Sequence, residues 1–550
     1  MKNRKNSTKK QRTTKVYSID IVKRNGRNTD IQNATPIVKP TNVEGHYPRF
    51  TLHGAINLLE EDIRELSIIL ESFISYLDKI GIQIHDTSNL IREIITGTQI
   101  FRRLKGISQV ELLPFAFKQV PWFTRYTHSC LTYVLGNYVI DRLKQFSPFN
   151  KFSQNEIEAA KLCFLIHDIG HGPFSHLTER AFKKPRGLIG KIPKEYDHEY
   201  WTKILLNELK DVLFDINKNP YLKKKSLKEE KANISIFSKA YKILSKEKAG
   251  IFSQLLSSQI DLDRIANYLG DRVVVNGILQ EEDVKKEEAV KLLSSVSETV
   301  DNIKRIINNI TILEVNEKGG KCKPYIAINE DAVVPVIHYL FDRHIIRYYL
   351  LKHYRREAAN NVLEKILLRA QYLVRNNLLD ELGKSDLLIS VWLFGSHTEA
   401  EFTEMNDELL FNQIKKWTKH TRDPVLRDLT MRFSANNFFC TYSSEKNNKP
   451  LKPSKEVIDN IKKKVIKSLK QTMRSSSFNN KAIEDYYFTY DETTSKPYHV
   501  NKEEILIYTS DKKIKKLSSY IKDTKNELGE LLLNTQFERY LFIVPSEVQL

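Results

Sequence analysis

A short segment of the chain brings several ionisable side chains together. It reads KLCFLIHDIGHGPFSH over residues 161–176, with His167 and Asp168 directly after an apolar run and His171 and His176 soon afterwards. Imidazole and carboxylate groups together suit hard and borderline divalent ions. Adjacent residues of a helix diverge by about 100°, so both can face one ion only near a helix end, and the following glycines are typical of such an end. The segment predicts half of a metal site or, taken alone, a hydrogen-bonded structural pair.

Further candidate ligands lie on both sides of this segment. Upstream, His128 precedes an apolar helical run that includes Leu131 and Leu135, and downstream QIDLDRIANYLGD carries Asp261 and Asp263. The order His … His-Asp … Asp, each on a predicted helix, resembles that of the HD-domain metal phosphohydrolases. We therefore expect one divalent ion to be held by side chains from several helices.

The flanking residues narrow the resemblance. HDIGHGPFSH is very similar to the signature of the HD-domain deoxynucleoside triphosphate triphosphohydrolases, a family that includes bacterial dGTP triphosphohydrolase-like enzymes and the animal enzyme that joins a sterile-alpha-motif to an HD domain. Weaker matches follow in family order over roughly residues 95–435: FRRLKGISQ (101–109), RYTH (125–128), DHEY (197–200), DLDRIANYLGD (261–271) and FTEMNDELLFNQIKKW (402–417).

The resemblance implies a role for each matching residue. The metal ligands would be His128, His167, Asp168 and Asp263, where Asp263 rather than Asp261 matches the second Asp of the family's DxDR pattern. The catalytic group would comprise His176 as the acid for the leaving 5′ oxygen, its partners Glu179 and His198, and His171 beside the substrate phosphates. The substrate contacts would be Gln109, Arg125, Arg264, Asn267, Tyr268, Asp271, Arg343 and His353.

The reaction that the resemblance implies is hydrolysis of a dNTP to a deoxynucleoside and inorganic triphosphate, in nucleotide-pool control or phage defence. Its cofactor would be one divalent ion: Mn, Fe, Mg, Co or Zn. The forked guanidinium groups of Arg125 and Arg264 would suit the triphosphate, and Gln109 and Asp271 match positions that contact the sugar 3′-hydroxyl. Two other functions stay open: an HD-type nucleotide phosphatase, phosphodiesterase or ribonucleotide (ATP) hydrolase, and a nucleic-acid-binding protein with an HD core.

Departures from the family pattern concern base and sugar specificity. Asn267 stands where the family has a sugar-stacking Tyr, and Tyr268 follows one position later. Leu351 replaces a pocket Tyr, and Tyr354 replaces a Lys. GTQI at 97–100 replaces the family's DTPQ, whose Asp belongs to a guanine-nucleotide activator site in the animal enzyme, so that form of regulation is not expected.

Hydrophobic spacing predicts a mainly α fold: an all-helical HD-domain core with small β-hairpins and a mixed α/β C-terminal region. We expect a basic disordered tail over 1–45, an amphipathic helical segment over 46–94 that includes a possible intersubunit helix at 59–80, the core with insertions over 95–435, and a basic α/β region over 436–550. A charged connection is expected over 219–232, a long helix over 284–310, and hairpin turns at Asn276-Gly277 and Gly319-Gly320.

The composition of the chain limits its binding partners and the cellular compartment that it suits. The chain has 550 residues, a formal net charge of +19 and a pI near 9.3. Such an excess suits a nucleoside triphosphate, or nucleic acid bound through the basic segments Lys2–Lys15 and Lys462–Arg474, although a lysine-rich composition alone also produces it. No run reaches the roughly 18 apolar residues of a membrane span, and the basic N-terminus lacks the apolar core of a secretory signal. Four scattered cysteines favour a reducing, cytoplasmic setting, and the resemblance implies a homo-oligomer.

Overall fold

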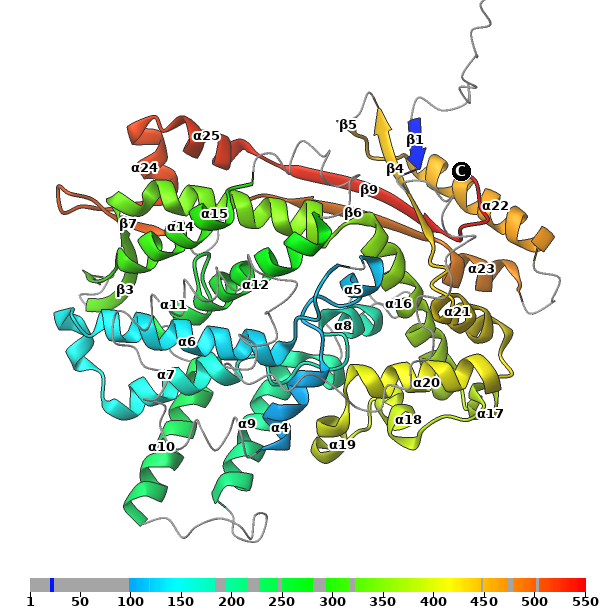
Figure 1. Ribbon diagram of the computed structural model, residues 1–550, viewed down its shortest axis with the longest axis horizontal. Coiled ribbons are helices and arrows are strands. Elements are labelled where there is room, and N and C mark those ends of the chain that lie inside the picture. The colour runs from blue at the N-terminus through cyan, green and yellow to red at the C-terminus, as the bar shows by residue number, and fades with distance from the viewer. Residues whose placement is uncertain are drawn as a thin grey trace, which may run out of the picture.

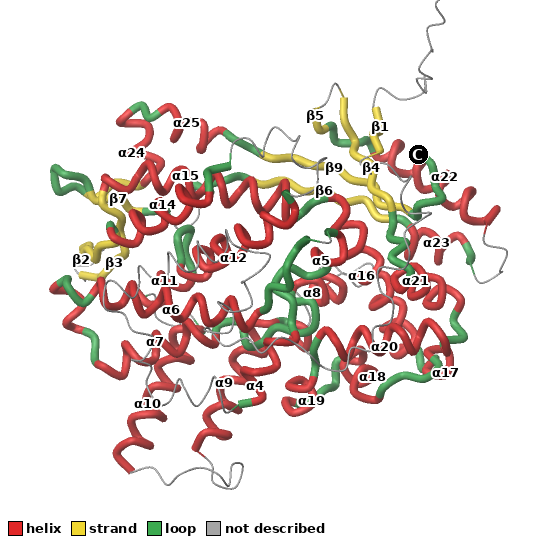
Figure 2. Tube along the Cα trace, viewed as in Figure 1, coloured by secondary structure: helices red, strands yellow, loops and turns green. Residues whose placement is uncertain are grey.

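The protein is mainly helical, with two small sheets (Figures 1 and 2). The computed structural model describes residues 20–23 and 98–550, apart from 118, 184–193, 215–226, 246–249, 280–292, 317–321, 447–448, 473–477 and 501–503. The predicted fold class, mainly α with small β elements, is confirmed by these helices and sheets. The helix expected at 59–80 lies outside the described residues.

The first half of the described chain carries the helices that hold the ionisable segment. They are α4 (Gln99–Arg102), α5 (Leu113–Ala116), α6 (Arg125–Leu143), α7 (Gln154–Ile166), α8 (His176–Lys183), α9 (His198–Phe214), α10 (Leu227–Leu244), α11 (Ile251–Leu256), α12 (Leu262–Ile278) and α14 (Val296–Asn308). Helix α7 starts with a capping box between Ser153 and Glu156 and ends in the fully buried run 162–166. That burial anchors the end of α7, because each large apolar side chain contributes about 1.5–3 kcal/mol on leaving water.

The second half combines helices with the sheets. Its helices are α15 (Val333–Ile345), the π-helical turn 346–351, α16 (Tyr354–Arg375), α17 (Leu379–Leu382), α18 (Leu387–Phe394), α19 (Glu399–Glu404), α20 (Asp407–His420), α21 (Pro424–Ser434), α22 (Lys455–Thr472), α23 (Asn480–Tyr487), α24 (Leu517–Thr524) and α25 (Glu527–Asn534). Helix α20 turns its apolar face into the core, where Leu410, Ile414 and Trp417 are buried. Helix α22 contains most of the basic segment Lys462–Arg474.

The strands form two separate sheets. One has the order β1 (Asp20–Lys23), β4 (Cys440–Lys446), β9 (Phe537–Val544), β6 (Thr489–Ser495), with β5 (Lys449–Pro450) also on β4. The other has the order β2 (Ile310–Asn316), β3 (Cys322–Asn329), β7 (Leu506–Tyr508), β8 (Ile514–Lys516). All pairs are antiparallel except β3 with β7. The hairpin predicted around Gly319-Gly320 is confirmed as β2 and β3, and its turn lies outside the described residues.

The turn predicted at Asn276-Gly277 is wrong, because both residues lie inside α12. The neighbouring Val274, Val275 and Ile278 are buried and continue the helix into the core. Gly277 is needed for close packing instead: a Cβ there would lie 2.3 Å from the carbonyl oxygen of Gln119. Packing of α12 against a neighbouring segment therefore overrides the local turn preference of the Asn-Gly pair.

Of the tail expected over 1–45, the structure describes only β1, which pairs with β4. Two other expectations need correction. The charged connection expected over 219–232 ends earlier, since α10 begins at Leu227. The described part of the helix expected over 284–310 is α14, and the chain has already entered β2 at Ile310.

A buried ionic cluster ties the turn before α5 to α8 and α16. Glu111, in this turn, has a left-handed backbone with φ of 57°. Its carboxylate accepts hydrogen bonds from Arg180 of α8, at 2.7 and 2.9 Å, and from Arg356 and Asn360 of α16. A left-handed non-glycine residue costs on the order of 1–3 kcal/mol and persists where its surroundings fix it. Here the bound carboxylate fixes it.

Glu111→Gln should destabilise the fold in a pH-dependent way. Burial alone would raise the pKa of Glu111, but the guanidinium groups of Arg180 and Arg356 hold it well below its usual range. The ionised form therefore stabilises the fold above the ordinary value of about 4.3, and this contribution is lost as the pH falls below it. Urea unfolding at pH 7 should show a loss of about 3 kcal/mol, and this difference from wild type should shrink at pH 3.5. The exposed-site control Glu530→Gln should show neither effect, and an equal loss at both pH values would contradict the account.

Candidate active site

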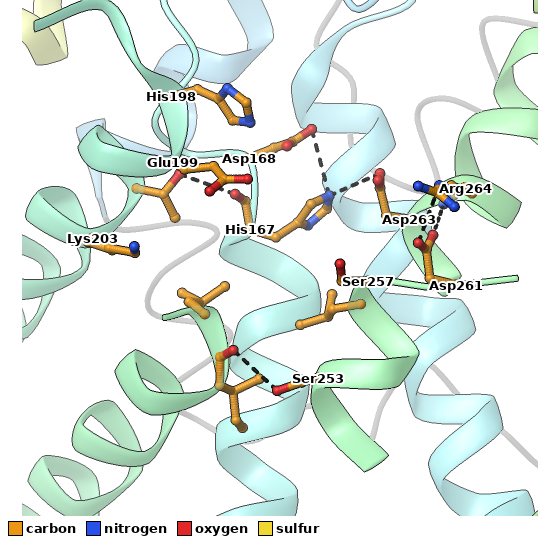
Figure 3. Close-up of a pocket in the computed structure, with 14 residues that line it drawn as sticks. His167, Asp168, His198, Glu199, Lys203, Ser253, Ser257, Asp261, Asp263 and Arg264 are labelled. Carbon is orange, nitrogen blue, oxygen red and sulfur yellow. Dashed lines mark hydrogen bonds and ion pairs between the residues drawn. The ribbon is translucent and has the colours of Figure 1, made fainter. Parts of the chain in front are cut away.

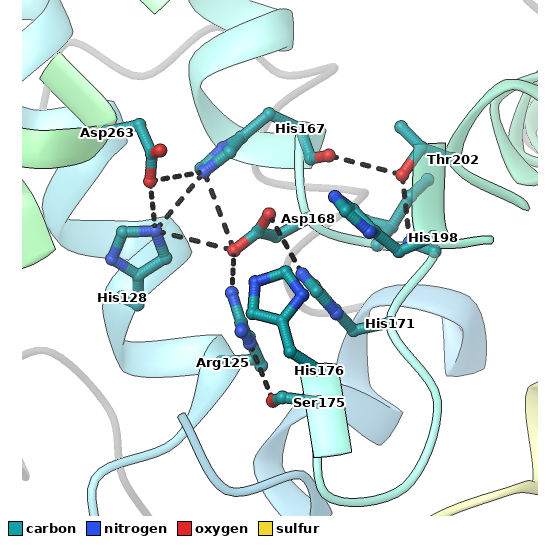
Figure 4. Close-up of polar contacts among 12 residues, drawn as sticks. Arg125, His128, His167, Asp168, His171, Ser175, His176, His198, Thr202 and Asp263 are labelled. Carbon is teal, nitrogen blue, oxygen red and sulfur yellow. Dashed lines mark hydrogen bonds and ion pairs between the residues drawn. The ribbon is translucent and has the colours of Figure 1, made fainter. Parts of the chain in front are cut away.

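Three helices direct their ends at one point, where four of the predicted side chains meet (Figure 4). His128 lies in the first turn of α6, His167 is the C-cap of α7 with Asp168 just beyond it, and Asp263 lies in the first turn of α12. Asp261 is not among the four. It caps α12 by accepting hydrogen bonds from the backbone of Arg264 and Ser258, at 2.6 and 2.9 Å.

The four donor atoms lie close enough to share one cation. His128 Nε2 is 3.2 Å from His167 Nε2, 3.0 Å from Asp263 Oδ1 and 3.4 Å from Asp168 Oδ2. His167 Nε2 is 3.4 Å from Asp263 Oδ1 and 3.7 Å from Asp168 Oδ2. Ligands about 2.0–2.1 Å from an ion in tetrahedral coordination are separated by about 3.3 Å. The donor set therefore fits a divalent ion.

The surroundings of the two imidazoles favour the same interpretation. The Nδ1 atom of His167 is 3.1 Å from the carbonyl oxygen of Phe164, to which it can donate, so that the Nε2 lone pair faces the centre. The two rings are inclined at 72°, so that their in-plane lone pairs can converge. Burial alone would lower the pKa of His167, but Asp168 and Asp263 outweigh it and raise the pKa to about 9. The site therefore attracts positive charge.

A second cluster lies beside the first. Glu179 of α8 joins two histidines: its Oε2 is 2.9 Å from His176 Nδ1 and its Oε1 is 2.7 Å from His198 Nδ1. Burial alone would raise the pKa of Glu179, but these two hydrogen bonds hold it well below its usual range. The side chain of His176 is 49 % exposed. The cluster presents one solvent-facing imidazole on a fixed carboxylate.

His171 connects the two clusters but does not extend the metal site. Its Nε2 is 3.4 Å from Asp168 Oδ1, and its ring contacts that of His176 at a centroid distance of 4.7 Å. Its ring also stacks on that of His198 with centroids 4.2 Å apart and planes inclined at only 7°. Lone pairs in two parallel, separated ring planes cannot converge on one ion. We therefore favour the first cluster as the metal site, although donor atoms of the second are also near one another.

A strained turn between the two clusters aims His176. Phe174 and Ser175 have left-handed backbones, with φ of 54° and 56°. The buried Asp407 of α20 holds the turn by accepting hydrogen bonds from the backbone of Phe174, at 2.6 Å, and of Ser108, at 2.8 Å. Arg125 donates to Ser175 at 2.8 Å and also to Asp168. Arg125 is buried, and these contacts position Asp168.

A cavity of about 210 Å³ opens beside the four donors (Figure 3). His167, Asp168 and Asp263 line it together with residues of α9. Helix α9 packs closely on the HD turn: a Cβ on Gly170 would lie 2.0 Å from the carbonyl oxygen of His198. Thr202 accepts a hydrogen bond from the Gly170 backbone and donates one to the carbonyl of His167, both at 3.1 Å.

Several residues of this site were not predicted from the sequence. Lys203 and Glu199 of α9 line the cavity, and Asp407 and Ser175 hold the turn before His176. Helical spacing could have identified the first two, because Glu199 and Lys203 are four residues apart on the helix that starts at His198. Asp407 gave no such signal, since its contacts join segments far apart in the sequence.

The predicted substrate contacts divide into those near the cavity and those away from it. Arg264 lines the cavity. Asp271 lies deeper along α12, where burial raises its pKa to about 7 although Arg347 and Arg343 lower it. Gln109 and Asn267 are bonded to each other at 2.6 Å.

Two predicted substrate contacts hold parts of the fold together. Tyr268 is a core residue, 1 % exposed, whose hydroxyl donates to Asp342 at 2.9 Å. Adjacent residues of a helix diverge by about 100°. Tyr268 therefore lies on the buried side of α12, although Asn267 beside it bonds to Asp263. His353 is the N-cap of α16 and accepts from the Arg355 backbone. Tyr268 therefore has a hydrogen bond in the core, and His353 caps α16.

Comparison with known proteins agrees with this geometry. The HD domain family model matches residues 125–234. A deoxynucleoside triphosphate triphosphohydrolase SAMHD1 homolog of Dictyostelium discoideum is 32% identical over 139 residues, 23% of this chain and 26% of that protein. The human SAMHD1 enzyme is 28% identical over 126 residues, 20% of each chain. The chain therefore contains an HD domain, and this part of it is similar to the dNTPases.

Longer matches extend beyond the HD domain. The uncharacterized protein YwfO of Bacillus subtilis is 24% identical over 364 residues, which cover 66% of this HD-domain protein and 70% of YwfO. The crystal structure of a phosphohydrolase from Bacteroides thetaiotaomicron superposes with a TM-score of 0.60 at 21% identity, over 83% of this chain and 96% of that one. The chain spans only about a quarter of the Dictyostelium enzyme. The match to the Bacteroides thetaiotaomicron structure shows that the two proteins share a fold over most of this chain.

None of the helices in the described part of the chain is long and apolar enough to cross a membrane.

Asp263→Asn should weaken binding of a divalent ion without unfolding the protein. The substitution keeps the shape of the side chain but removes one of the two negative charges that face His128 and His167. We expect wild type to bind one Mn²⁺ per chain and the variant to bind at least about tenfold more weakly, as measured by isothermal titration and elemental analysis. Asp301→Asn, at an exposed site on α14, is the control. Equal Mn²⁺ affinity in Asp263→Asn and wild type would contradict the assignment.

Proposed function

We propose that this HD-domain protein hydrolyses deoxynucleoside triphosphates to a deoxynucleoside and inorganic triphosphate. The observation that carries the proposal is the adjacency of two groups: four donors that fit a divalent ion, and an exposed imidazole on a buried carboxylate. A single side chain, His171, bridges Asp168 and His176. A phosphoryl group bound at the four donors would thus have a proton donor, His176, beside its leaving oxygen.

The metal ligands in this proposal are His128, His167, Asp168 and Asp263. When bound there, a divalent ion would supply Lewis acidity toward a phosphoryl oxygen and a water of lowered pKa. Mn, Fe, Mg, Co and Zn all suit two imidazoles with two carboxylates to differing degrees, and the donor set does not choose among them.

The remaining residues handle the proton and the charge. A water oxygen bonds to the α-phosphorus and releases a proton to the solvent, the bond from phosphorus to the 5′ oxygen breaks, and that oxygen takes up a proton. His176 would donate this proton from Nε2, because Glu179 holds its Nδ1. His198 keeps Glu179 in place from the other side, and Glu179 and Asp168 raise the pKa of His198 although burial opposes them. His171 stays neutral, since burial, Arg125 and His198 hold its pKa well below its usual range.

The cavity suits the anionic part of such a substrate. Arg264 and Lys203 are the cations in its lining, and they face a cavity that also holds His167 and Asp168. Charge-assisted hydrogen bonds from such groups are the usual means of holding phosphates. We propose Arg264 as a triphosphate contact, as the sequence predicts, and add Lys203.

Binding to nucleic acid and self-association stay predictions. The basic segment Lys2–Lys15 lies outside the described residues. On α22, Lys463, Lys464 and Lys467 are exposed, whereas Lys462 is paired with Asp459 and Glu484. An exposed lysine face alone does not distinguish a nucleic-acid contact from a solvated surface.

His176→Gln should lower kcat for dNTP hydrolysis by about 10²–10⁴ while leaving Mn²⁺ binding intact. The purified protein is incubated with each dNTP and NTP in Mn²⁺, and the products are separated by chromatography. Wild type should release tripolyphosphate and deoxynucleoside, and His420→Gln, an exposed site on α20, should match wild type. Orthophosphate or a nucleoside monophosphate as the product would contradict the proposal and support a phosphatase or a phosphodiesterase. Activity confined to NTPs would support a ribonucleotide hydrolase.

A further inference from the structure

Asn267 lies between a predicted substrate contact and a predicted metal ligand. It is one turn after Asp263 on α12, and its Nδ2 donates to Asp263 Oδ1 at 2.8 Å. On its other side, Gln109 Nε2 donates to Asn267 Oδ1 at 2.6 Å. Gln109 comes from the turn before α5, where its backbone N–H donates to the carbonyl of Phe123 at 2.8 Å. The two amides form a continuous chain to the oxygen atom that also faces both metal-site imidazoles.

The direction of these hydrogen bonds is fixed from one end. An ionised carboxylate can only accept hydrogen bonds, whereas a side-chain amide has one donating and one accepting end. Asp263 therefore requires the NH₂ group of Asn267, which turns the Asn267 carbonyl toward Gln109. That carbonyl in turn requires the NH₂ group of Gln109. The accepting oxygen of Gln109, Oε1, is left at the far end of the chain.

That oxygen is in need of a donor. Gln109 Oε1 is buried and has no hydrogen-bond partner among the described residues. A buried polar atom without a partner is rare in folded proteins and marks a place where a ligand or water completes the bonding. Only a group with an O–H or N–H can do so here. A deoxynucleoside triphosphate carries one sugar hydroxyl, at the 3′ position.

We infer that Asn267 is a positioning residue that couples recognition of a ligand hydroxyl at Gln109 to the orientation of Asp263. The inference rests on the proposed function for the identity of the ligand and of the metal ligands. A donor on Gln109 Oε1 polarises the amide, which strengthens the next hydrogen bond in the chain and then the one to Asp263. A ligand with the hydroxyl therefore favours the orientation of Asp263 seen here more than the same ligand without it.

The coupling has a consequence for affinity. If a hydroxyl-bearing ligand raises the affinity of the four-donor site for a divalent ion, the ion raises the affinity for that ligand by the same factor. The site then selects against ligands that lack the hydroxyl before any chemistry occurs. Asn267 itself need not touch the ligand, because Gln109 and Asp263 engage both ends of its amide. This reassigns Asn267 from the direct substrate contact that the sequence predicts.

The test compares Mn²⁺ affinity in the full-length protein by isothermal titration. Each protein is titrated alone, with a non-hydrolysable α,β-imido dNTP, and with its 2′,3′-dideoxy counterpart. In wild type the hydroxyl-bearing analogue should tighten Mn²⁺ binding at least about fivefold more than the dideoxy analogue does. In Asn267→Leu, Mn²⁺ alone should bind about 10–100-fold more weakly than in wild type. The two analogues should then change the affinity for Mn²⁺ by the same factor.

Matched variants separate this role from a general effect on folding. Asn276→Leu makes the same change on the same helix, about 14 Å farther along it, and should behave as wild type. Asn267→Ser, a smaller residue that cannot clash, should also lose the difference between analogues if Asn267→Leu fails to fold. Circular dichroism establishes that each variant is folded.

The outcomes are distinguishable. If wild type binds Mn²⁺ but a folded Asn267 variant binds it equally well, or still distinguishes the two analogues, the inference is overturned and the proposed function stands. If wild type binds no Mn²⁺, the metal site of the proposed function fails, and the inference fails with it.

Discussion

The rest of the structure depends on the close packing of four donor atoms, two of them on carboxylates, around a space that suits one cation. Two imidazole nitrogens lie 3.2 Å apart, and carboxylate oxygens of Asp168 and Asp263 lie within 3.0–3.7 Å of them. Negative charges buried in a protein interior are costly unless a positive charge compensates them, so a cation shared among these donors would stabilise the group. The arrangement therefore constrains three helices at once, and the apolar burial of α6, α7 and α12 holds their ends in place.

The second feature is a strained turn that holds His176 close to that centre. The HD turn leaves α7, passes through two left-handed residues and starts α8 at His176. Buried polar groups offset this strain, since Asp407 and Arg125 bond to the turn itself. Glu111 performs a similar task one helix turn farther on, through Arg180. Polar groups are therefore concentrated where the backbone is least regular, which is typical of functional sites.

The sequence predicted the local parts of this arrangement better than the contacts between them. Helix periodicity and the HD signature identified the helical fold and the four donors that the structure brings together, because those signals lie within short segments. The Asn276-Gly277 turn failed because packing against Gln119 decides the conformation there. Arg125 and Tyr268 were assigned to the substrate from the family resemblance, and in the structure their side chains bond to Asp168 and Asp342. Asp407 could not have been chosen, since its partners lie far away in the sequence.

Anomalous diffraction from crystals soaked in Mn²⁺ tests the central claim most directly, because it locates the ion independently of activity. The account predicts one strong peak among His128, His167, Asp168 and Asp263, about 2.0–2.3 Å from their donor atoms. It also predicts no peak between the stacked rings of His171 and His198. An empty four-donor site in crystals that bind Mn²⁺ elsewhere, or a peak held by His171, His176 and His198, would contradict the account.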